Sequence, residues 1–187
     1  MVINPYQQCP VYQSPHYLLR IVNLEDTRDL LSCYADPLAA PIFNSDNCTS
    51  DFVYHTLEEM QECIKFWLDS YVTGHFIRFS VVDLATQKAV GTIECFAKPE
   101  TFEQFGKVAV LRLDLASMYE KPSTLLEILQ LVDENFFDCF AVNSLITKAV
   151  KPAQARITAL LELDYKKLEP NPIMPYPEYY IKLNTSI

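Results

Sequence analysis

Only three of the 187 residues are glycine, at positions 74, 91 and 106. Average usage would give about 13 glycines in a chain of this length. Glycine is the residue that adopts a left-handed backbone without a steric cost, so few turns of this chain can depend on it. Functions that need a glycine-rich loop around a phosphate group are disfavoured for the same reason.

The size and composition of the chain favour one compact domain over residues 1–187. Half of the residues are hydrophobic and 21% are charged, which excludes an intrinsically disordered chain. No apolar run approaches the roughly 18–20 residues that cross a bilayer, so we expect no membrane partner. The first residues lack the basic and apolar regions of a signal peptide, and we therefore expect a cytoplasmic protein.

Charge and cysteine spacing argue against two kinds of ligand, nucleic acid and metal ions. The net charge of −9 disfavours binding to nucleic acid, which needs clustered Lys and Arg. The six cysteines form no C-x-x-C pair and share no ligand spacing with the three histidines, so no metal site is expected. We expect these thiols to be reduced and to pack as small hydrophobic groups, Cys95 among them.

The hydrophobic pattern predicts a mixed α/β domain. Prolines at 5, 10 and 15 predict an extended N-terminal arm over residues 1–15. Helices are predicted after Asn23, after Thr56, from Pro122 and over 153–163. Strands are predicted at 17–22, 76–84, 89–96, 108–115, 145–150, 165–168 and 179–183. The expected architecture is a central, mostly antiparallel twisted sheet of six to seven strands, flanked by about four helices.

Two segments give the sharpest local predictions. Thr56-Leu57-Glu58-Glu59 is a capping box, and the apolar residues that follow recur at three and four positions, with Trp67 among them in the core. In the strand at 108–115, the leucines at 111, 113 and 115 share one face, and Arg112 and Asp114 lie on the other.

This order of elements resembles that of the GNAT superfamily of acetyl-CoA-dependent N-acetyltransferases. Val90-Gly91-Thr92-Ile93-Glu94 matches its third strand, and Leu160-Leu161-Glu162-Leu163-Asp164-Tyr165 is similar to the end of its last helix. Within the superfamily, the chain looks most like the branch that acetylates ribosomal-protein N-termini. The resemblance implies direct acetyl transfer from acetyl-CoA to an amine, either a protein N-terminus or a small cationic amine. Homodimers are common among such relatives.

The resemblance also assigns a coenzyme loop to residues 119–124. The family pattern there is Q/R-x-x-G-x-G/A, and its amides cradle the pyrophosphate of the coenzyme. In this chain Tyr119 replaces Gln or Arg, Pro122 replaces the first glycine and Thr124 replaces the second small residue. The implied coenzyme-binding groups are Lys121, Ser123 and Thr124, together with backbone amides at Leu113 and Leu115, one of which would stabilise the oxyanion.

A second family marker is replaced throughout. When the chain is aligned with the family at Asp164-Tyr165, the family's Asn falls at Ala153 and its small residue at Arg156. The family's Tyr, which protonates the departing thiolate, falls at Leu160. The candidate catalytic groups are therefore Glu94 and Asp114, each as a base toward the amine. The alternatives are a solvated strand-face carboxylate for Glu94 and an ion pair with Arg112 for Asp114.

Other candidates have simpler interpretations. Tyr176, Tyr179 and Tyr180 could supply a phenol, but aromatic residues of strands usually pack, and His55 and His75 are expected at capping or surface positions. Asp46 and Asp51 lie in the 41–55 loop, on the side where the family binds its acceptor, and they favour a cationic amine. The alternative function is a GNAT-like domain that has lost acetyl-CoA binding and serves in binding or regulation.

Overall fold

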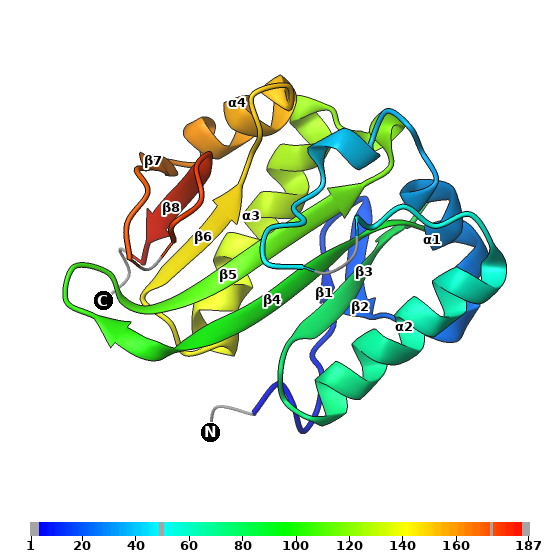
Figure 1. The fold of residues 1–187 in the computed structure, drawn as a ribbon, viewed down its shortest axis with the longest axis horizontal. Helices are drawn as coiled ribbons and strands as arrows, with labels where there is room; N and C mark the ends of the chain where they lie inside the picture. Colours follow the sequence, from blue (N-terminus) through cyan, green and yellow to red (C-terminus); the bar gives the residue numbers. More distant parts are fainter. Residues whose placement is uncertain (1–3, 49–50, 173, 185–187) are drawn as a thin grey trace.

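The computed structural model describes residues 4–48, 51–172 and 174–184, and these residues form one eight-stranded sheet in the order β1-β2-β3-β4-β5-β6-β8-β7 (Figure 1). The strands are β1 (Tyr12–Gln13), β2 (Tyr17–Ile21), β3 (Ile77–Asp83), β4 (Lys88–Phe102), β5 (Gly106–Leu115), β6 (Ser144–Lys148), β7 (Lys166–Leu168) and β8 (Tyr179–Leu183). β5 and β6 are parallel, and the other neighbouring strands are antiparallel. The predicted mixed, mostly antiparallel sheet is confirmed.

The sheet has one strand more than the upper end of the predicted range of six to seven. β1 lies inside the segment that was predicted to be an extended arm, and it pairs with β2 through Tyr12 and Leu19. The first described residues of that arm also turn back, since the Gln7 amide donates to the Asn4 carbonyl. Proline spacing had indicated only that the segment is extended, and it carries no information on which strand edge the segment joins.

Four α-helices cover the two faces of the sheet in the described part of the chain. They are α1 (Thr27–Tyr34), α2 (Leu57–Val72), α3 (Pro122–Cys139) and α4 (Gln154–Glu162). The leucines of β5 pack with α3 and α4 in one apolar cluster, whereas α1 and α2 form a second cluster on the opposite face. Arg112 and Asp114 point toward the α1–α2 face, as their alternation with the leucines predicted. No helix among the described residues is long and apolar enough to cross a membrane.

The capping box of α2 is confirmed in detail. Thr56 Oγ1 accepts a hydrogen bond from the Glu59 amide at 3.2 Å, and Glu59 Oε2 accepts one from the Thr56 amide at 3.0 Å. These bonds fix the first turn of the helix, and buried Trp67 then lies against the sheet. α2 therefore forms a well-anchored wall on the α1–α2 face.

Residues other than glycine occupy most of the left-handed positions that the structure describes. Asn47, Phe52, Gln87, Ala141, Asp164 and Glu178 all have positive φ, in addition to Gly74 and Gly106. Asp164 follows α4 in a Schellman arrangement, in which the Tyr165 amide donates to the Leu160 carbonyl and the Asp164 amide to the Leu161 carbonyl. The shortage of glycine is thus met by strained L-residues rather than by fewer turns.

The two parallel strands part before β5 ends. β5 pairs with β6 only from Val108–Ser144 to Leu111–Thr147, while its pairing with β4 continues to Leu115. Residues 112–115 of β5 therefore have no strand partner on the β6 side. This divergence, near the centre of the sheet, is the feature of the fold around which the candidate site lies.

Candidate functional site

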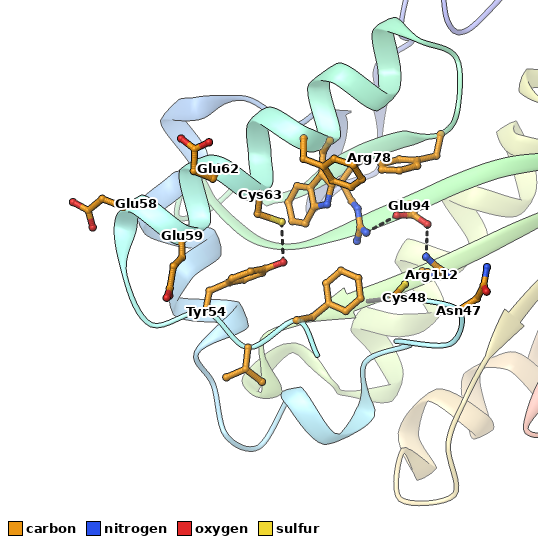
Figure 2. Close-up of a pocket in the computed structure, with 15 residues that line it drawn as sticks. Asn47, Cys48, Tyr54, Glu58, Glu59, Glu62, Cys63, Arg78, Glu94 and Arg112 are labelled. Atoms are coloured by element: carbon orange, nitrogen blue, oxygen red, sulfur yellow. Dashed lines mark hydrogen bonds and ion pairs between the residues drawn. The ribbon is translucent and has the colours of Figure 1, made fainter. Parts of the chain in front are cut away.

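A cavity of about 940 Å³, which we call the α2 cavity, lies between α2, residues 47–48 and 52–54, and strands β3 to β5 (Figure 2). Its aromatic lining comes from Phe52, Tyr54, Phe66, Trp67 and Phe76, and α2 contributes Glu58, Glu59 and Glu62 at the outer end. The inner end is formed by Arg78, Glu94 and Arg112. Arg112 is the first residue of β5 beyond its last pair with β6, so the cavity reaches the strand divergence.

Glu94 is buried between two arginines at this inner end. Its Oε2 accepts from Arg78 Nη2 at 2.5 Å, and its Oε1 accepts from Arg112 Nη1 at 2.8 Å. Only 3% of the residue is exposed. The expectation of a solvated strand-face carboxylate is therefore wrong, because the cross-strand partners Arg78 and Arg112 neutralise Glu94 and allow its burial.

Asp114 belongs to the same network but lies behind the cavity wall. Its Oδ2 accepts from Arg78 Nη1 at 3.0 Å and from the Tyr34 hydroxyl at 2.9 Å. The predicted pair with Arg112 is not formed, because Arg112 reaches Glu94 instead. Burial raises the pKa of Asp114 above its ordinary value, and Arg78 and the Tyr34 hydrogen bond only partly oppose this shift. Arg78, which sequence reasoning overlooked, thus joins both predicted catalytic carboxylates.

A segment of the α1–α2 connection crosses the sheet next to Arg112. Arg112 Nη2 donates to the main-chain carbonyl of Asp46 at 2.8 Å, and Lys148 Nζ lies 2.8 Å from both carboxylate oxygens of Asp46. The buried Tyr179 hydroxyl also donates to Asp46, at 3.2 Å. Asp46 is therefore neutralised by the fold, while Asp51, the other acidic residue singled out in this loop, is exposed.

A second cavity, of about 290 Å³, lies on the other side of this segment. It shares Asn47 and Arg112 with the α2 cavity, and Tyr176 and Tyr179 contribute to its opposite wall. Tyr180, the third tyrosine considered, is buried in the cluster on the α3 face. Arg112 thus stands where the two cavities meet, beside the β5–β6 divergence.

The start of α3 holds the residues assigned to the coenzyme. Lys121 and Ser123 are exposed, and Lys121 is the N-cap without a side-chain hydrogen bond to the helix. Thr124 is buried, and its hydroxyl lies 3.1 Å from the Tyr17 hydroxyl. Tyr119 donates to Asp83 Oδ2 at 2.8 Å, and burial together with that carboxylate raises the pKa of Tyr119 to about 12. Pro122 offers no amide proton, so Ser123 and Thr124 are the first residues of the helix that have one.

Arg156 from α4 occupies the space beside the free edge of β5. Its Nη1 donates to the Leu113 carbonyl at 2.8 Å, and its Nη2 forms an ion pair with the Glu120 carboxylate. Both side chains are largely buried. The Leu113 carbonyl, part of the strand segment assigned to the coenzyme, is thus already bound, whereas the Leu115 main chain faces Gly91 of β4.

The remaining candidates have structural roles. Trp67 and Cys95 are buried in the core, as predicted, and burial raises the pKa of Cys95 well above its ordinary value. His55 and His75 are exposed, and His75 Nδ1 lies 2.8 Å from Thr73 Oγ1 beside the end of α2. These positions agree with the surface roles expected for both histidines.

Comparison with solved structures identifies the architecture. The ribosomal-protein-S5-alanine acetyltransferase from Vibrio fischeri matches with a TM-score of 0.67 and 14% identity, over 95% of this chain and 98% of that one. A ribosomal L7/L12 alpha-N-protein acetyltransferase, RimL, in complex with coenzyme A, matches with a TM-score of 0.70 and 10% identity, over 93% and 98% of the two chains. The chain has the fold of the GNAT acetyltransferases.

RimJ from Mycobacterium smegmatis, solved with a coenzyme A disulfide, matches the same GNAT fold with a TM-score of 0.67 and 10% identity, over 90% of this chain and 82% of that one. No family model and no curated protein matches the sequence. At these identities the likeness establishes the fold, and the activity has to be argued from the site.

Proposed function

We propose that the protein is an acetyl-CoA-dependent N-acetyltransferase, in which the acceptor amine reaches β5 from the α2 cavity. The observation that carries this proposal is the position of Arg112, which lines the inner end of the cavity and begins the unpaired part of β5. An amine bound in the cavity would therefore lie beside the free edge of β5, where the resemblance to GNAT enzymes would place the thioester of acetyl-CoA. Acetyl-CoA, when bound, supplies the activated acyl group.

The start of α3 offers a partial fit to the phosphates of the coenzyme. Ser123 and Thr124 present amides at the first turn of an 18-residue helix, and Lys121 adds an exposed ammonium group. Arg156 would have to release the Leu113 carbonyl before that strand edge could hold another group. Once released from Glu120, the Arg156 guanidinium would favour an anionic group of the coenzyme at the same place.

The residues of the cavity prepare the amine chiefly by position and environment. Both Glu94 oxygens are bound to arginines, so we assign Glu94 a positioning role, in which it holds Arg78 and Arg112 at the inner end. An ammonium group that enters an aromatic cavity loses hydration, which favours the neutral amine needed for attack. Holding that amine in line with the acyl carbon would then supply most of the rate enhancement.

A second candidate function is favoured by one observation, the buried Arg156–Glu120 ion pair. Arg156 binds Glu120, in the loop assigned to the pyrophosphate, and also the Leu113 carbonyl, at the strand edge assigned to the rest of the coenzyme. A domain with this arrangement would bind an amine without transferring an acetyl group.

Binding of acetyl-CoA separates the two functions. At 100 times its Kd the coenzyme should stabilise the native state by about 2.7 kcal/mol, which calorimetry or a thermal shift detects. Transfer should be followed as the mass increase of the amine product, because the partly exposed free cysteines would react with thiol reagents. The absence of any thermal shift at millimolar acetyl-CoA would refute the enzyme and leave the binding domain.

A further inference from the structure

Five aromatic side chains contribute to the walls of the α2 cavity. Trp67 and Phe66 come from one helix, and the Phe66 and Phe76 rings meet edge to face with centroids 6.0 Å apart. Tyr54 lies opposite, where its hydroxyl accepts a hydrogen bond from the Cys63 thiol at 3.0 Å. These rings favour a ligand with a compact apolar group, which a linear polyamine lacks.

Phe52 completes this wall. Phe52 has a φ of 58° and is only 7% exposed. A bulky residue in the left-handed region is strained, and such strain concentrates at functional sites. The Phe52 ring lies 5.9 Å from the Arg78 guanidinium, so the strained backbone places an aromatic group over the inner end of the cavity.

The charges along the cavity change from the mouth to the inner end. Glu58, Glu59 and Glu62 are exposed on the first two turns of α2. Lys65 pairs with Glu62, and the other two carboxylates leave the mouth with a negative potential. At the inner end, the charges of Arg78 and Arg112 are balanced by those of Glu94 and Asp114. An ammonium group is thus attracted at the mouth, whereas a neutral amine is favoured deeper in the cavity.

We infer that the acceptor is a primary amine carried on a compact apolar body, such as an aryl-alkyl amine, rather than a polyamine or a polar peptide N-terminus. This inference rests on the proposed function, because it takes the α2 cavity as the acceptor site. The aromatic walls hold the body, and the acidic mouth selects the cation over an isosteric acid.

The only tryptophan of the chain, Trp67, lines this cavity and provides a specific fluorescence signal. The experiment titrates the full-length protein, without acetyl-CoA, with 2-phenylethylamine, phenylacetate and spermidine, and confirms each Kd by calorimetry. Phenylethylamine should bind at least about tenfold more tightly than either comparison compound, a ratio that corresponds to about 1.4 kcal/mol. Equal affinity for phenylacetate, tighter binding of spermidine or no binding of phenylethylamine would each overturn the inference.

Matched variants test the location of the site. Phe66 is 61% exposed, so Phe66→Ala should leave the fold intact and weaken phenylethylamine about two- to fivefold. Val72→Ala, at an 80% exposed position of the same helix but outside the cavity, should have no effect. The double variant E58Q/E62Q should weaken the amine and reduce the salt dependence of binding, while Glu103→Gln should not. Phe66→Ala with unchanged affinity would place the ligand elsewhere and overturn the assignment.

Failure of this inference can be distinguished from failure of the proposed function. Amine binding that is never followed by acetylation, in a protein that does not bind acetyl-CoA, refutes the transferase and leaves the ligand class standing. Acetylation of spermidine or of an alanine-initiated peptide in preference to phenylethylamine refutes the ligand class and leaves the transferase standing.

Discussion

Arg78 donates from Nη2 to Glu94 Oε2 at 2.5 Å, and both residues are almost wholly buried. The same guanidinium also binds Asp114 and lies 4.4 Å from the centroid of the Trp67 ring. One side chain therefore links strands β3, β4 and β5 to helix α2, at the inner end of the α2 cavity. This link connects the stability of the sheet to the shape of the candidate site.

Replacement of Arg78 by methionine should be strongly destabilising. The variant leaves Asp114 without its arginine partner and Glu94 with Arg112 alone, although both carboxylates are almost wholly buried. Loss of one partner from a buried ion pair costs about 3–5 kcal/mol in the free energy of unfolding. Urea unfolding measures it, with Lys65→Met in the exposed Lys65–Glu62 pair as the control, expected to cost less than about 1 kcal/mol. Equal costs for both variants would contradict the role given to Arg78.

The network at Arg78 also shows where sequence reasoning stops. Helix and strand periodicity predicted every described α-helix and seven strands, because buried faces impose regular spacing. Periodicity does not give the register between strands, so it could not show that Arg78 faces Glu94 while Arg112 turns away from Asp114. An arginine between the apolar residues Ile77 and Phe79 of a strand was the available signal for a buried acidic partner.

The site itself was predictable only in part. The face that carries Arg112 and Asp114 followed from simple alternation, and the departures at Tyr119 and Pro122 followed from the family pattern. The contact of Arg156 with the Leu113 carbonyl did not, because the position of α4 relative to β5 depends on tertiary packing. The two-residue strand β1 was also too short to give a period.

Gly91 should be the least replaceable of the three glycines. A Cβ at this position would lie 2.1 Å from the Asp114 carbonyl oxygen and 2.8 Å from the Leu115 Cα, both main-chain atoms that cannot move aside singly. Gly91→Ala should lower the free energy of unfolding by about 3 kcal/mol or more. Gly74→Ala meets no atom within 4 Å, and its cost should be only about 0.5–1 kcal/mol, because the lower entropy of unfolded alanine offsets about half of the roughly 1–2 kcal/mol of a left-handed backbone. Urea unfolding compares them, and a larger loss for Gly74→Ala would contradict the packing argument.

Asp26 should make stability depend on pH in the acid range. Burial alone would raise its pKa, but hydrogen bonds from Arg20, Ser80 and the Asn23 amide outweigh burial and lower the pKa below its ordinary value. A carboxyl with a lowered folded-state pKa contributes stability above its unfolded pKa of about 3.9, and this contribution is lost as the pH falls through the folded-state value.

Asp26→Asn should therefore cost about 2 kcal/mol at pH 7, and the difference from the parent protein should shrink below about pH 4. Urea unfolding at a series of pH values measures the difference, with the exposed Asp138→Asn as the control. A constant difference across the acid range would show that Asp26 acts through shape and not through charge.

Pro122→Gly should strengthen the binding of acetyl-CoA. The substitution restores an amide proton at the first residue of α3, beside the exposed Lys121. A hydrogen bond to a charged group contributes about 1.5–3 kcal/mol, so the Kd measured by calorimetry should fall roughly tenfold or more. Pro170→Gly, in an exposed loop, controls for the loss of a proline. An unchanged Kd would refute the account of this loop.

Asp164→Gly should stabilise the protein, which would show that scarcity of glycine has a cost in this fold. Asp164 has a φ of 64° at the left-handed position after α4, where the Schellman hydrogen bonds fix the chain, and no side-chain hydrogen bond of Asp164 is seen in the described structure.

A left-handed conformation costs an L-residue roughly 1–2 kcal/mol, and the greater entropy of unfolded glycine offsets about half of the gain. The free energy of unfolding should therefore rise by about 0.5–1 kcal/mol, measured as a higher midpoint of urea unfolding. Glu162→Gly, at the last residue of α4 and two residues before Asp164, should instead lower the free energy of unfolding by about 1 kcal/mol, because helical φ gives glycine no advantage there. A fall in stability for both variants would mean that the carboxylate of Asp164, and not its backbone, determines the choice of residue at this position.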